Sequence, residues 1–255
     1  MRIASWNVNS LRVRLPQVLD WLQDNPVDVL ALQETKLVDE EFPVQEIREA
    51  GYHVQYSGQK TYNGVAILSR EPASEAQAGI DGLEDPQRRI LAATVEGVRV
   101  LNLYVVNGSE VGSEKYAYKL DWLDKVTAFL RTDLQQHPRY VVLGDFNIAP
   151  EDQDVHDPKA WEGSILCSDR ERQALQAVLD LGFADTFRLF EQEQDSFSWW
   201  DYRAAGFRRN LGLRIDLILA SAELEAVCSF STIDKEPRGN ERPSDHAPVI
   251  AEFEL

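Results

Sequence analysis

The chain has 255 residues, of which 26 are Lys or Arg and 43 are Asp or Glu, so its formal net charge is −17. An apolar fraction of 44% supplies enough surface for a sizeable core and excludes collagen-like, coiled-coil and disordered classes. No apolar run reaches the roughly 18 residues of a membrane-spanning helix. The N-terminus lacks the apolar stretch of a signal peptide, and Cys167 and Cys228 are too few for a disulfide framework. We therefore expect free thiols and a cytoplasmic protein.

Strand-like and helix-like segments alternate along the first half of the chain. Short apolar runs predict strands, and apolar residues on one helical face predict a helix that begins near Pro16. Glu96-Gly97 between two apolar runs predicts a hairpin. The predicted elements are a helix at Leu15–Asp24 and strands at Arg2–Val8, Val27–Leu32, His53–Tyr56, Gly64–Ser69, Ile90–Val95 and Val98–Val106.

The second half continues the alternation with its longest helical pattern first. The predicted elements are helices at Glu114–Gln136 and Asp169–Leu181, the latter capped by Gly182, and strands at Tyr140–Leu143, Phe197–Asp201, Arg214–Ala220, Ala226–Thr232 and Val249–Phe253. Hairpin signals mixed with helical crossovers favour an α/β fold with mixed sheets. So many strands suggest two packed β-sheets flanked by helices, and the lack of a linker or repeat predicts one domain over residues 1–255.

Polar residues cluster where predicted strands begin or end. Singly, each has an ordinary explanation, because Asn-Gly and Gly-Asp mark turns and a Glu after a strand is usually a surface residue. Together, they would converge on one cleft if the strands share an edge. The residues are Asn7, Asn9, Gln33, Glu34, Asn102, Tyr104, Asn107, Asp145, Asn147, Asp216, Ser244, Asp245 and His246.

Asp216 indicates that this cluster is functional, because it sits within the apolar run Leu213–Leu219. A buried carboxylate is costly unless it is paired, and His246 is its natural partner. Asp216 would hold His246 in one tautomer and favour its protonated form, and His246 would then donate to a phosphate oxygen.

The remaining polar groups suit metal-assisted hydrolysis of a phosphodiester. Glu34 and Asp245, with Asn7 or Asn9 nearby, offer hard oxygen ligands for magnesium or manganese, and no Cys/His set indicates zinc. A metal on a phosphate oxygen would stabilise the transition state. Asp145 would deprotonate a water, with Asn147 fixing the geometry.

Several motifs resemble the endonuclease/exonuclease/phosphatase superfamily. Four short ones are shared across that superfamily: Trp6-Asn7-Val8-Asn9, Leu32-Gln33-Glu34-Thr35-Lys36, Gly144-Asp145-Phe146-Asn147 and Ser244-Asp245-His246-Ala247-Pro248. Three others narrow the resemblance to its exonuclease III branch, the bacterial apurinic/apyrimidinic endonucleases: Gln87-Arg88-Arg89, the run from Phe197 to Arg203, and Leu211-Gly212-Leu213-Arg214-Ile215-Asp216. The resemblance covers nearly the whole chain.

The resemblance implies a four-layer αβ sandwich whose site lies at one edge of two sheets, with a divalent cation, usually magnesium, near Glu34. Matched position by position, the metal residues are Asn7, Glu34 and Asp245, and the catalytic residues are Tyr104, Asp145, Asn147, Asp216 and His246. Tyr104 is the rival of Asp145 for activating water. Positions near the phosphate backbone are Lys36, Arg89 and Asn107, and those of an apolar pocket for a flipped abasic sugar are Trp199, Leu213 and Ile215.

The implied function is a monomeric DNA-repair nuclease that cleaves 5′ to abasic sites in double-stranded DNA, with 3′→5′ exonuclease and 3′-phosphatase or phosphodiesterase activity. A small slot closed by aromatic and aliphatic groups would admit a baseless sugar and exclude a nucleotide with its base. The alternatives are a phosphatase of a small phosphorylated substrate and a non-catalytic RNA-binding relative. The second of these is disfavoured because Glu34, Asp145 and His246 are all present.

Two features depart from the resemblance. The family commonly has Pro where this chain has Val106, which leads us to expect a more mobile loop. A net charge of −17 should repel nucleic acid, so DNA binding requires a local, salt-sensitive cluster of basic residues. The candidates are Lys36, Lys60, Arg88, Arg89, Lys115, Lys119, Arg203, Arg208, Arg209 and Arg214.

Overall fold

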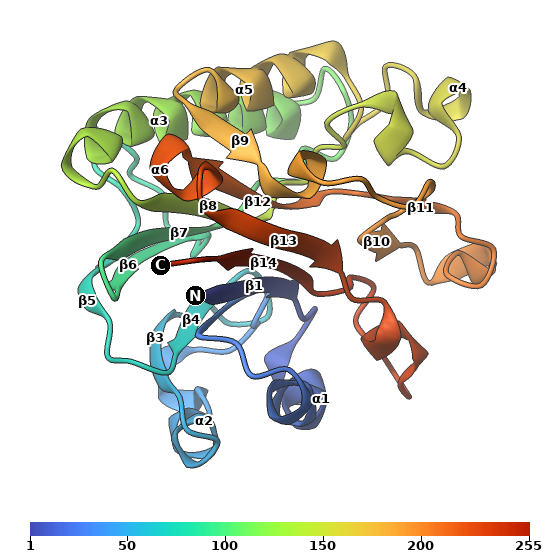
Figure 1. Ribbon diagram of the computed structural model, residues 1–255. Coiled ribbons are helices and arrows are strands. Elements are labelled where there is room, and N and C mark those ends of the chain that lie inside the picture. The colour runs from blue at the N-terminus through green and yellow to red at the C-terminus, as the bar shows by residue number, and fades with distance from the viewer.

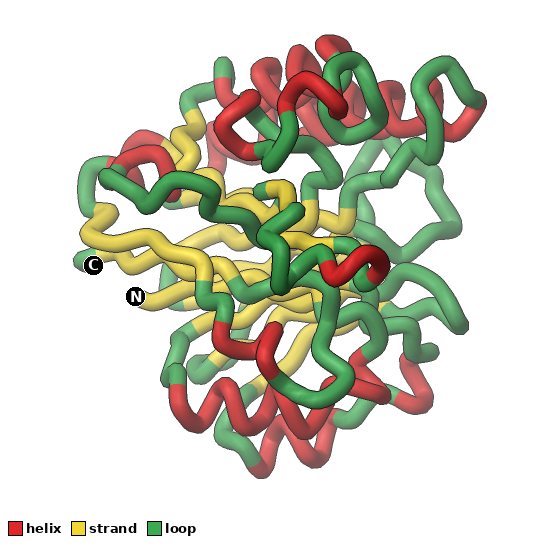
Figure 2. Tube along the Cα trace, turned by 90° about the vertical axis from the view of Figure 1, so that its right-hand side faces the viewer, coloured by secondary structure: helices red, strands yellow, loops and turns green.

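The computed structural model describes residues 1–255 and shows a sandwich of two six-stranded sheets between layers of helices (Figures 1 and 2). The first sheet is mixed, because β1 and β2 are parallel and every other pair in it is antiparallel. In spatial order its strands are β13 (Cys228–Ile233), β14 (Val249–Phe253), β1 (Arg2–Asn7), β2 (Val29–Gln33), β4 (Val65–Ser69) and β3 (His53–Ser57).

The second sheet has the same mixed character, since only β7 and β8 pair in parallel. In spatial order its strands are β5 (Ser74–Ala78), β6 (Ile90–Val95), β7 (Val98–Tyr104), β8 (Tyr140–Asp145), β12 (Asp216–Ser221) and β9 (Phe183–Asp185). A separate two-stranded ribbon joins β10 (Trp199–Trp200) to β11 (Gly212–Leu213).

The helices form the outer two layers (Figure 1). In Figure 1, α1 (Leu11–Asp24) and α2 (Val44–Glu49) lie below the first sheet, and α3 (Glu114–Gln136) and α5 (Asp169–Leu179) lie above the second. Two short helices, α4 (Pro158–Trp161) and α6 (Ala222–Glu225), complete the set. No helix has the length and apolar character that a membrane crossing requires. The fold is therefore the predicted four-layer αβ sandwich of two mixed sheets flanked by helices.

Alternation along the strands builds the three apolar layers. In β2, Val29 and Ala31 face the second sheet, whereas Leu30 and Leu32 join the core beneath the helices of the first sheet. Because successive side chains of a strand point to opposite faces, a strand covered on both sides reads as a continuous apolar run. This explains why the central strands were predictable from short apolar runs.

The face between the sheets changes from apolar to polar toward one edge. In β1, the residues that follow Ile3 on this face are Ser5 and Asn7, because every second residue of a strand points to the same side. The same progression ends in Gln33 in β2 and in Asp145 in β8. The parallel pairs β1–β2 and β7–β8 each end their strands together, so both sheets present polar groups at this edge.

Several predicted elements have different bounds in the structure. The helix predicted at 15–24 begins at Leu11, and Pro16 lies inside it on the exposed side. The backbone N–H groups of Ser10 and Leu11 donate to the carbonyls that follow β2, and these bonds start the helix earlier. The segment 197–201 is a strand only at Trp199–Trp200, and the strand predicted at 214–220 begins at Asp216.

The elements without a prediction are short or exposed. They include α2, α4, α6, β5 and β9. Four of the five residues of β5 are exposed, so its sequence carries no apolar alternation to mark it as a strand. Cys167 and Cys228 are both free, as predicted.

Candidate active site

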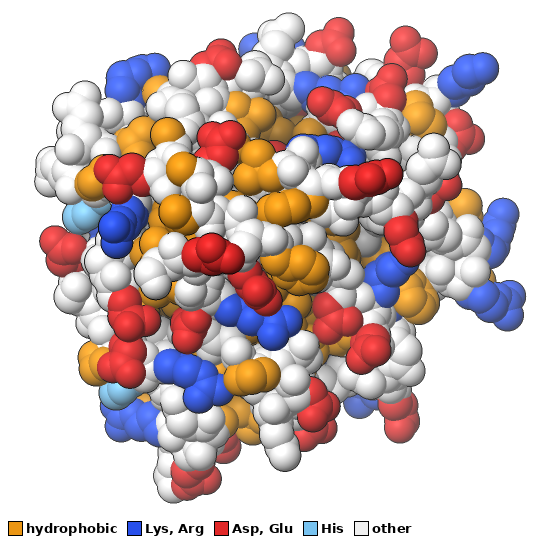
Figure 3. Space-filling view, in the orientation of Figure 1, with side chains coloured by type: hydrophobic (Ala, Val, Ile, Leu, Met, Phe, Trp, Pro, Cys, Tyr) orange, Lys and Arg blue, Asp and Glu red, His pale blue; other side chains and the backbone are white.

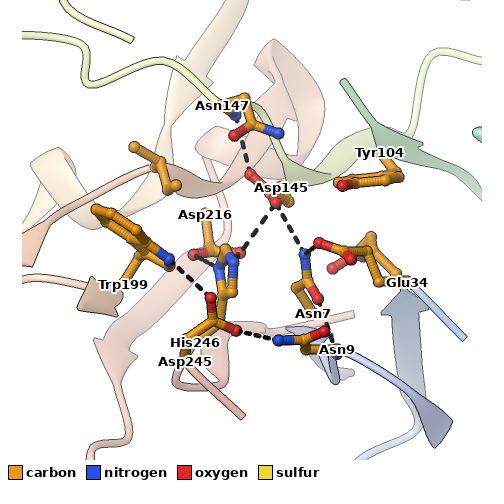
Figure 4. Close-up of polar contacts among 12 residues, drawn as sticks. Asn7, Asn9, Glu34, Tyr104, Asp145, Asn147, Trp199, Asp216, Asp245 and His246 are labelled. Atoms are coloured by element: carbon orange, nitrogen blue, oxygen red, sulfur yellow. Dashed lines mark hydrogen bonds and ion pairs between the residues drawn. The ribbon is translucent and has the colours of Figure 1, made fainter. Parts of the chain in front are cut away.

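The site forms where the polar ends of the two sheets meet (Figure 4). The first sheet supplies Asn7 at the end of β1, Glu34 after β2, and His246 before β14. The second sheet supplies Tyr104 and Asp145, which are paired in register at the ends of β7 and β8. Asp216, at the start of β12, is in register with Asp145, so side chains from the ends of six strands face one small volume. The side-chain oxygens or nitrogens of Glu34, Asp145 and His246 lie within 4.8 Å of one another.

Asp216 and His246 form the predicted buried pair. The Nδ1 atom of His246 lies 2.8 Å from Oδ2 of Asp216, which also accepts a hydrogen bond of 2.7 Å from the Ser198 hydroxyl. Burial lowers the pKa of His246, but the Asp216 and Asp145 carboxylates outweigh it and raise that pKa to about 10. The imidazole is therefore a cation at neutral pH, fixed by Asp216 and with Nε2 3.7 Å from Asp145.

Asp145 lies at the centre of the site and contacts both sheets. Its Oδ2 accepts a hydrogen bond of 2.8 Å from the Asn7 amide, and its Oδ1 accepts one of 2.9 Å from the Asn147 backbone N–H. Burial raises the pKa of Asp145 to about 7, and the cationic His246 opposes that rise. A carboxylate with this pKa is a base suited to neutral pH.

Four of the sixteen non-glycine residues with positive φ angles lie around these groups. Asn9, Glu34, Lys36 and Asn147 have φ between 43° and 55°, a region that non-glycine residues seldom occupy. Two of them are tied to each other, because the Lys36 ammonium donates a hydrogen bond of 2.6 Å to the Asn9 side-chain oxygen. Such local strain is typical of functional sites.

The residues present fit a hard divalent cation at Glu34. The Asn7 amide nitrogen bridges Glu34 and Asp145, and the Lys36 ammonium lies 3.0 Å from Glu34 Oε2. Carboxylate oxygens are donors that Mg²⁺ or Mn²⁺ prefers, and the Lys36 ammonium places a positive charge beside them. The Asn7 amide nitrogen donates to both carboxylates and so orients them, and the role of Asn7 as a metal ligand stays a prediction.

Asp245 lies apart from this carboxylate pair. Its Oδ1 accepts a hydrogen bond from the Asn9 amide and its Oδ2 one from the Trp199 indole N–H, both of 3.0 Å. The cluster of possible ligands thus consists of Glu34, Asp145 and His246, and Asp245 is not a member. The role of Asp245 as a metal ligand stays a prediction.

Tyr104 is a neutral hydrogen-bond donor in this environment. Burial, with the nearby Glu34 and Asp145 carboxylates, raises the pKa of its phenol well above the usual value. The Arg89 guanidinium lies 4.6 Å from the ring centroid and does not reverse this. A phenol that holds its proton so firmly is a poor base, which favours Asp145 over Tyr104 for activating water.

The three predicted pocket residues differ in accessibility. Leu213 and Ile215 are 0% and 1% exposed, within an apolar cluster that also contains Val155, Leu166 and Cys167. Trp199 is half-buried, packs against this cluster and is in register with Leu213. Only Trp199 reaches the surface, so Leu213 and Ile215 support it from behind, and their role in sugar recognition stays a prediction.

Of the residues predicted near phosphate, Arg89 and Asn107 line a surface pocket of about 310 Å³ next to Tyr104. The exposed Lys115 lines it as well, and the Asn107 amide donates to the Asn147 side-chain oxygen at 3.2 Å. Val106, which stands where the family commonly has Pro, is only 5% exposed and packs into the core of the second sheet.

The expected basic cluster is smaller than predicted. Lys119 and Arg214 are buried and paired, so they do not belong to it. Arg214 bonds Asp154 and Asp185, both at 2.7 Å, because the carboxylates compensate its buried charge. Acidic and basic side chains intermingle on the face in Figure 3, and basic ones project at the edge where β10 and β11 lie in Figure 1. The candidates that remain are Lys36, Lys60, Arg88, Arg89, Lys115, Arg203, Arg208 and Arg209.

Lys119 has a structural role that sequence reasoning missed. Its ammonium pairs with the fully buried Glu171 and donates to the backbone carbonyls of Asn107 and Asn147, at 3.2 and 2.6 Å. Burial lowers the pKa of Lys119, while Glu171 supports its charged form. Its position in a plain helical pattern gave no signal, because its partners lie far away in the sequence.

We expect Lys119→Met to destabilise the fold strongly. It would leave the Glu171 carboxylate buried without its partner, which typically costs about 3–5 kcal/mol. Urea denaturation would measure the free energy of unfolding. The matched control is Lys125→Met in the same helix, which breaks the exposed pair with Asp121 and should cost under about 1 kcal/mol. Equal losses in the two variants would contradict the role of Lys119.

Comparisons with known proteins identify the family. A family model described as the Endonuclease/Exonuclease/phosphatase family matches residues 4–246. The Haemophilus influenzae protein named exodeoxyribonuclease III is 36% identical, over 99% of this chain and 100% of its own length. The chain belongs to the endonuclease/exonuclease/phosphatase family, in its exonuclease III branch. It is accordingly a phosphodiester hydrolase.

Solved structures of this branch match the whole chain. The 3′ phosphatase NExo from Neisseria, bound to a product DNA hairpin, is 51% identical with a TM-score of 0.98, and each chain is covered completely. A structure of NExo from Neisseria meningitidis describes it as a 3′-5′ exonuclease. An AP endonuclease from Archaeoglobus fulgidus is 38% identical with a TM-score of 0.96, again over 100% of both chains. The predicted family and fold are confirmed.

Proposed function

We propose that this protein is a monomeric DNA-repair hydrolase that breaks the P–O3′ bond of DNA and leaves a 3′-hydroxyl. This one reaction covers removal of a 3′-phosphate, release of a 3′-terminal nucleotide and incision 5′ to an abasic site. The names of the Neisseria and Archaeoglobus relatives support this range of substrates. The observation that carries the proposal is the position of Asp145 between the carboxylate Glu34 and the cationic His246.

Asp145 supplies the base in the proposed reaction. It accepts a proton from a water as that water attacks the phosphorus, and a pKa of about 7 suits this task at neutral pH. The P–O3′ bond breaks as the new P–O bond forms, and the departing 3′-oxygen takes up a proton from solvent to become the 3′-hydroxyl. The Asn147 backbone N–H and the Asn7 amide hold its two oxygens, so the carboxylate keeps one orientation. Such preorganisation removes reorientation from the barrier.

His246 stabilises the charge that develops on the phosphate oxygens. Asp216 holds Nδ1, which leaves the Nε2 proton directed into the site (Figure 4). A fixed cationic donor in a buried site stabilises a developing anion more than water would. The neutral Tyr104 hydroxyl is a second donor in reach of the same volume.

Magnesium, with manganese as a substitute, is the proposed cofactor, held by Glu34 with the help of Asp145 and Asn7. When bound there, it would polarise a phosphate oxygen and neutralise part of its charge. The Lys36 ammonium, 3.0 Å from Glu34, would bind a phosphate of the DNA backbone. Arg89, Asn107 and Lys115 would bind the neighbouring phosphates of the strand, despite the acidic net charge of the chain.

Three duplex substrates would test the proposal: one with a 3′-phosphate, one with a recessed 3′-hydroxyl end, and one with an internal abasic-site analogue. With Mg²⁺, we expect a 3′-hydroxyl product from each, and no reaction in EDTA. Hydrolysis of inositol phosphates without any DNA cleavage would instead favour the small-substrate phosphatase. Failure on all three DNA substrates would refute the proposal.

The pKa values predict a plateau of activity between about pH 7 and 10. Asp145 must be ionised, so the rate falls as the pH drops below its pKa of about 7; His246 must be protonated, so the rate falls as the pH rises above about 10. Because a cation favours the carboxylate form, raising Mg²⁺ should move the acidic limb to lower pH. Asp216→Asn should move the alkaline limb to lower pH, because Asp216 is the main group that raises the His246 pKa. The pH profile of kcat/KM at two Mg²⁺ concentrations measures both limbs, and an unmoved alkaline limb would count against the assignment.

A further inference from the structure

A second set of polar side chains lies directly beneath the active site, in the layer between the two sheets. The set consists of Ser5, two positions before Asn7; Gln33, directly before Glu34; and Asn102, two positions before Tyr104. All three side chains are 0% exposed. The side chains deeper on the same strand faces, such as Ile3 and Val100, form an entirely apolar core. The reaction described above uses none of these three polar groups.

Their hydrogen bonds join one sheet to the other. The Asn102 side-chain amide in β7 donates to the backbone carbonyls of Leu32 in β2 and Ala66 in β4, both at 2.9 Å. The Gln33 amide donates to the Asn102 side-chain oxygen at 2.8 Å and to the Ser5 hydroxyl at 3.0 Å. Asn102 thus has its two N–H groups and its oxygen engaged, all with partners in the first sheet.

We call Ser5, Gln33 and Asn102, with the hydrogen bonds that join them, the clamp. It lies next to catalytic groups that must be kept at a set distance from one another. Gln33 directly precedes Glu34 and is in register with Asn7. Glu34 and Asn7 are the first-sheet residues at the proposed cation site. Asn102 lies two residues before Tyr104, on the same strand face, and Tyr104 is in register with Asp145. The active site is therefore split between two sheets, and the clamp connects the strands that carry its two halves.

We propose that Asn102, held by Gln33, is a positioning residue that sets the separation between Glu34 on the first sheet and Asp145 on the second. Packing of two apolar faces is non-directional, so it does not by itself fix how one sheet slides over the other. Hydrogen bonds have preferred lengths and angles, and buried ones are costly to leave unmade. Three of them at one point select a single placement of the sheets beside the reacting groups.

A second inter-sheet hydrogen bond provides a matched control. Ser231 in β13 and Thr186, which follows β9, share a buried hydroxyl bond of 3.1 Å on another side of the sandwich. Ser231→Ala removes a buried polar contact between the same two sheets, away from the strands that carry Glu34 and Asp145. If any loss of inter-sheet hydrogen bonding lowered activity, this variant would behave like a variant of the clamp.

The experiment compares Asn102→Leu, Gln33→Met and Ser231→Ala with the wild type in two assays. The first is Mn²⁺ binding to the DNA-free protein, measured by electron paramagnetic resonance, and the second is kcat and KM on a 3′-phosphate duplex. We expect each clamp variant to bind Mn²⁺ about 10-fold more weakly and to lose about 10- to 100-fold in kcat, because groups that orient metal ligands have effects of this size. KM for DNA should stay within about twofold, and Ser231→Ala should match the wild type in both assays.

This inference rests on the proposed function, but the two fail in different ways. A wild-type protein that binds Mn²⁺ and cleaves no DNA would refute the proposed function, while the binding assay would still test the clamp. Folded clamp variants with unchanged Mn²⁺ affinity and kcat, or a Ser231→Ala variant with equal losses, would overturn the positioning role. If Asn102→Leu does not fold, Gln33→Met decides, because it keeps the two bonds from Asn102 to the backbone of the first sheet.

Discussion

Replacing Asp145 with Asn is expected to lower kcat by about 10³-fold or more on a 3′-phosphate duplex with saturating Mg²⁺. The amide has the shape of the carboxylate and still accepts the hydrogen bond from the Asn147 backbone N–H. It cannot take a proton from water, and loss of a general base typically costs about 10²- to 10⁴-fold. It also removes one of the charges that would hold the proposed cation. Single-turnover rates measure the chemical step directly, and gel-shift titration measures DNA binding.

DNA binding by the Asp145→Asn variant should equal or exceed that of the wild type, because the substitution removes a negative charge from the phosphate site. Asp124→Asn is the control: Asp124 lies on the exposed side of α3, so this variant makes the same chemical change away from the site. A loss of less than about 10-fold in Asp145→Asn would assign the base to another group. Tyr104 would then be the next candidate.

Replacing His246 with Gln should lower kcat by about 10²- to 10³-fold, the usual effect of removing a donor to a developing anion. Gln retains hydrogen-bonding capacity but carries no charge at any pH. Asp216→Asn should have a similar effect, because Asp216 acts on the reaction through His246, which it orients and keeps protonated. The measurement is kcat on the 3′-phosphate duplex for both single variants and the double variant.

The double variant should lose no more than the worse single one. Residues that act as a unit give strongly non-additive losses, since the second substitution has nothing left to remove. Multiplied losses would show that Asp216 and His246 act independently. In that case the 2.8 Å contact between them would be structural and not part of the reaction.

Local sequence patterns were sufficient for the central part of the fold. The strands at the centre of each sheet are apolar on both faces, so their residues are marked in the sequence by uninterrupted apolar runs, as in β2 and β8. The edge strand β5 has no such mark, because one of its faces and its outer edge meet solvent. The early start of α1 was likewise not predictable, since it depends on hydrogen bonds from Ser10 and Leu11 to a distant part of the chain.

The motifs identified the polar groups of the site, but not all of their partners. Asp216 could be assigned to His246, because a carboxylate inside an apolar run needs a cationic partner. Nothing in the local sequence distinguishes Lys119 from a surface cation, whereas Arg214 lies in the same apolar run as Asp216. Both proved to be buried in ion pairs. The bonds from Asp245 to Asn9 and Trp199 were equally hidden, since they join residues more than 40 positions apart.

The amino-acid sequence by itself determined the kind of chemistry: which strands form, which polar side chains stand at their ends, and which family the motifs resemble. Those properties follow from residue type and from periodicity along the chain. Only the tertiary structure decided how the two sheets are stacked, and therefore which carboxylates share the site and which cations are buried. Contacts between distant segments set the burial and the electrostatic field around each group, and these in turn make Asp145 a base near neutral pH and His246 a cation.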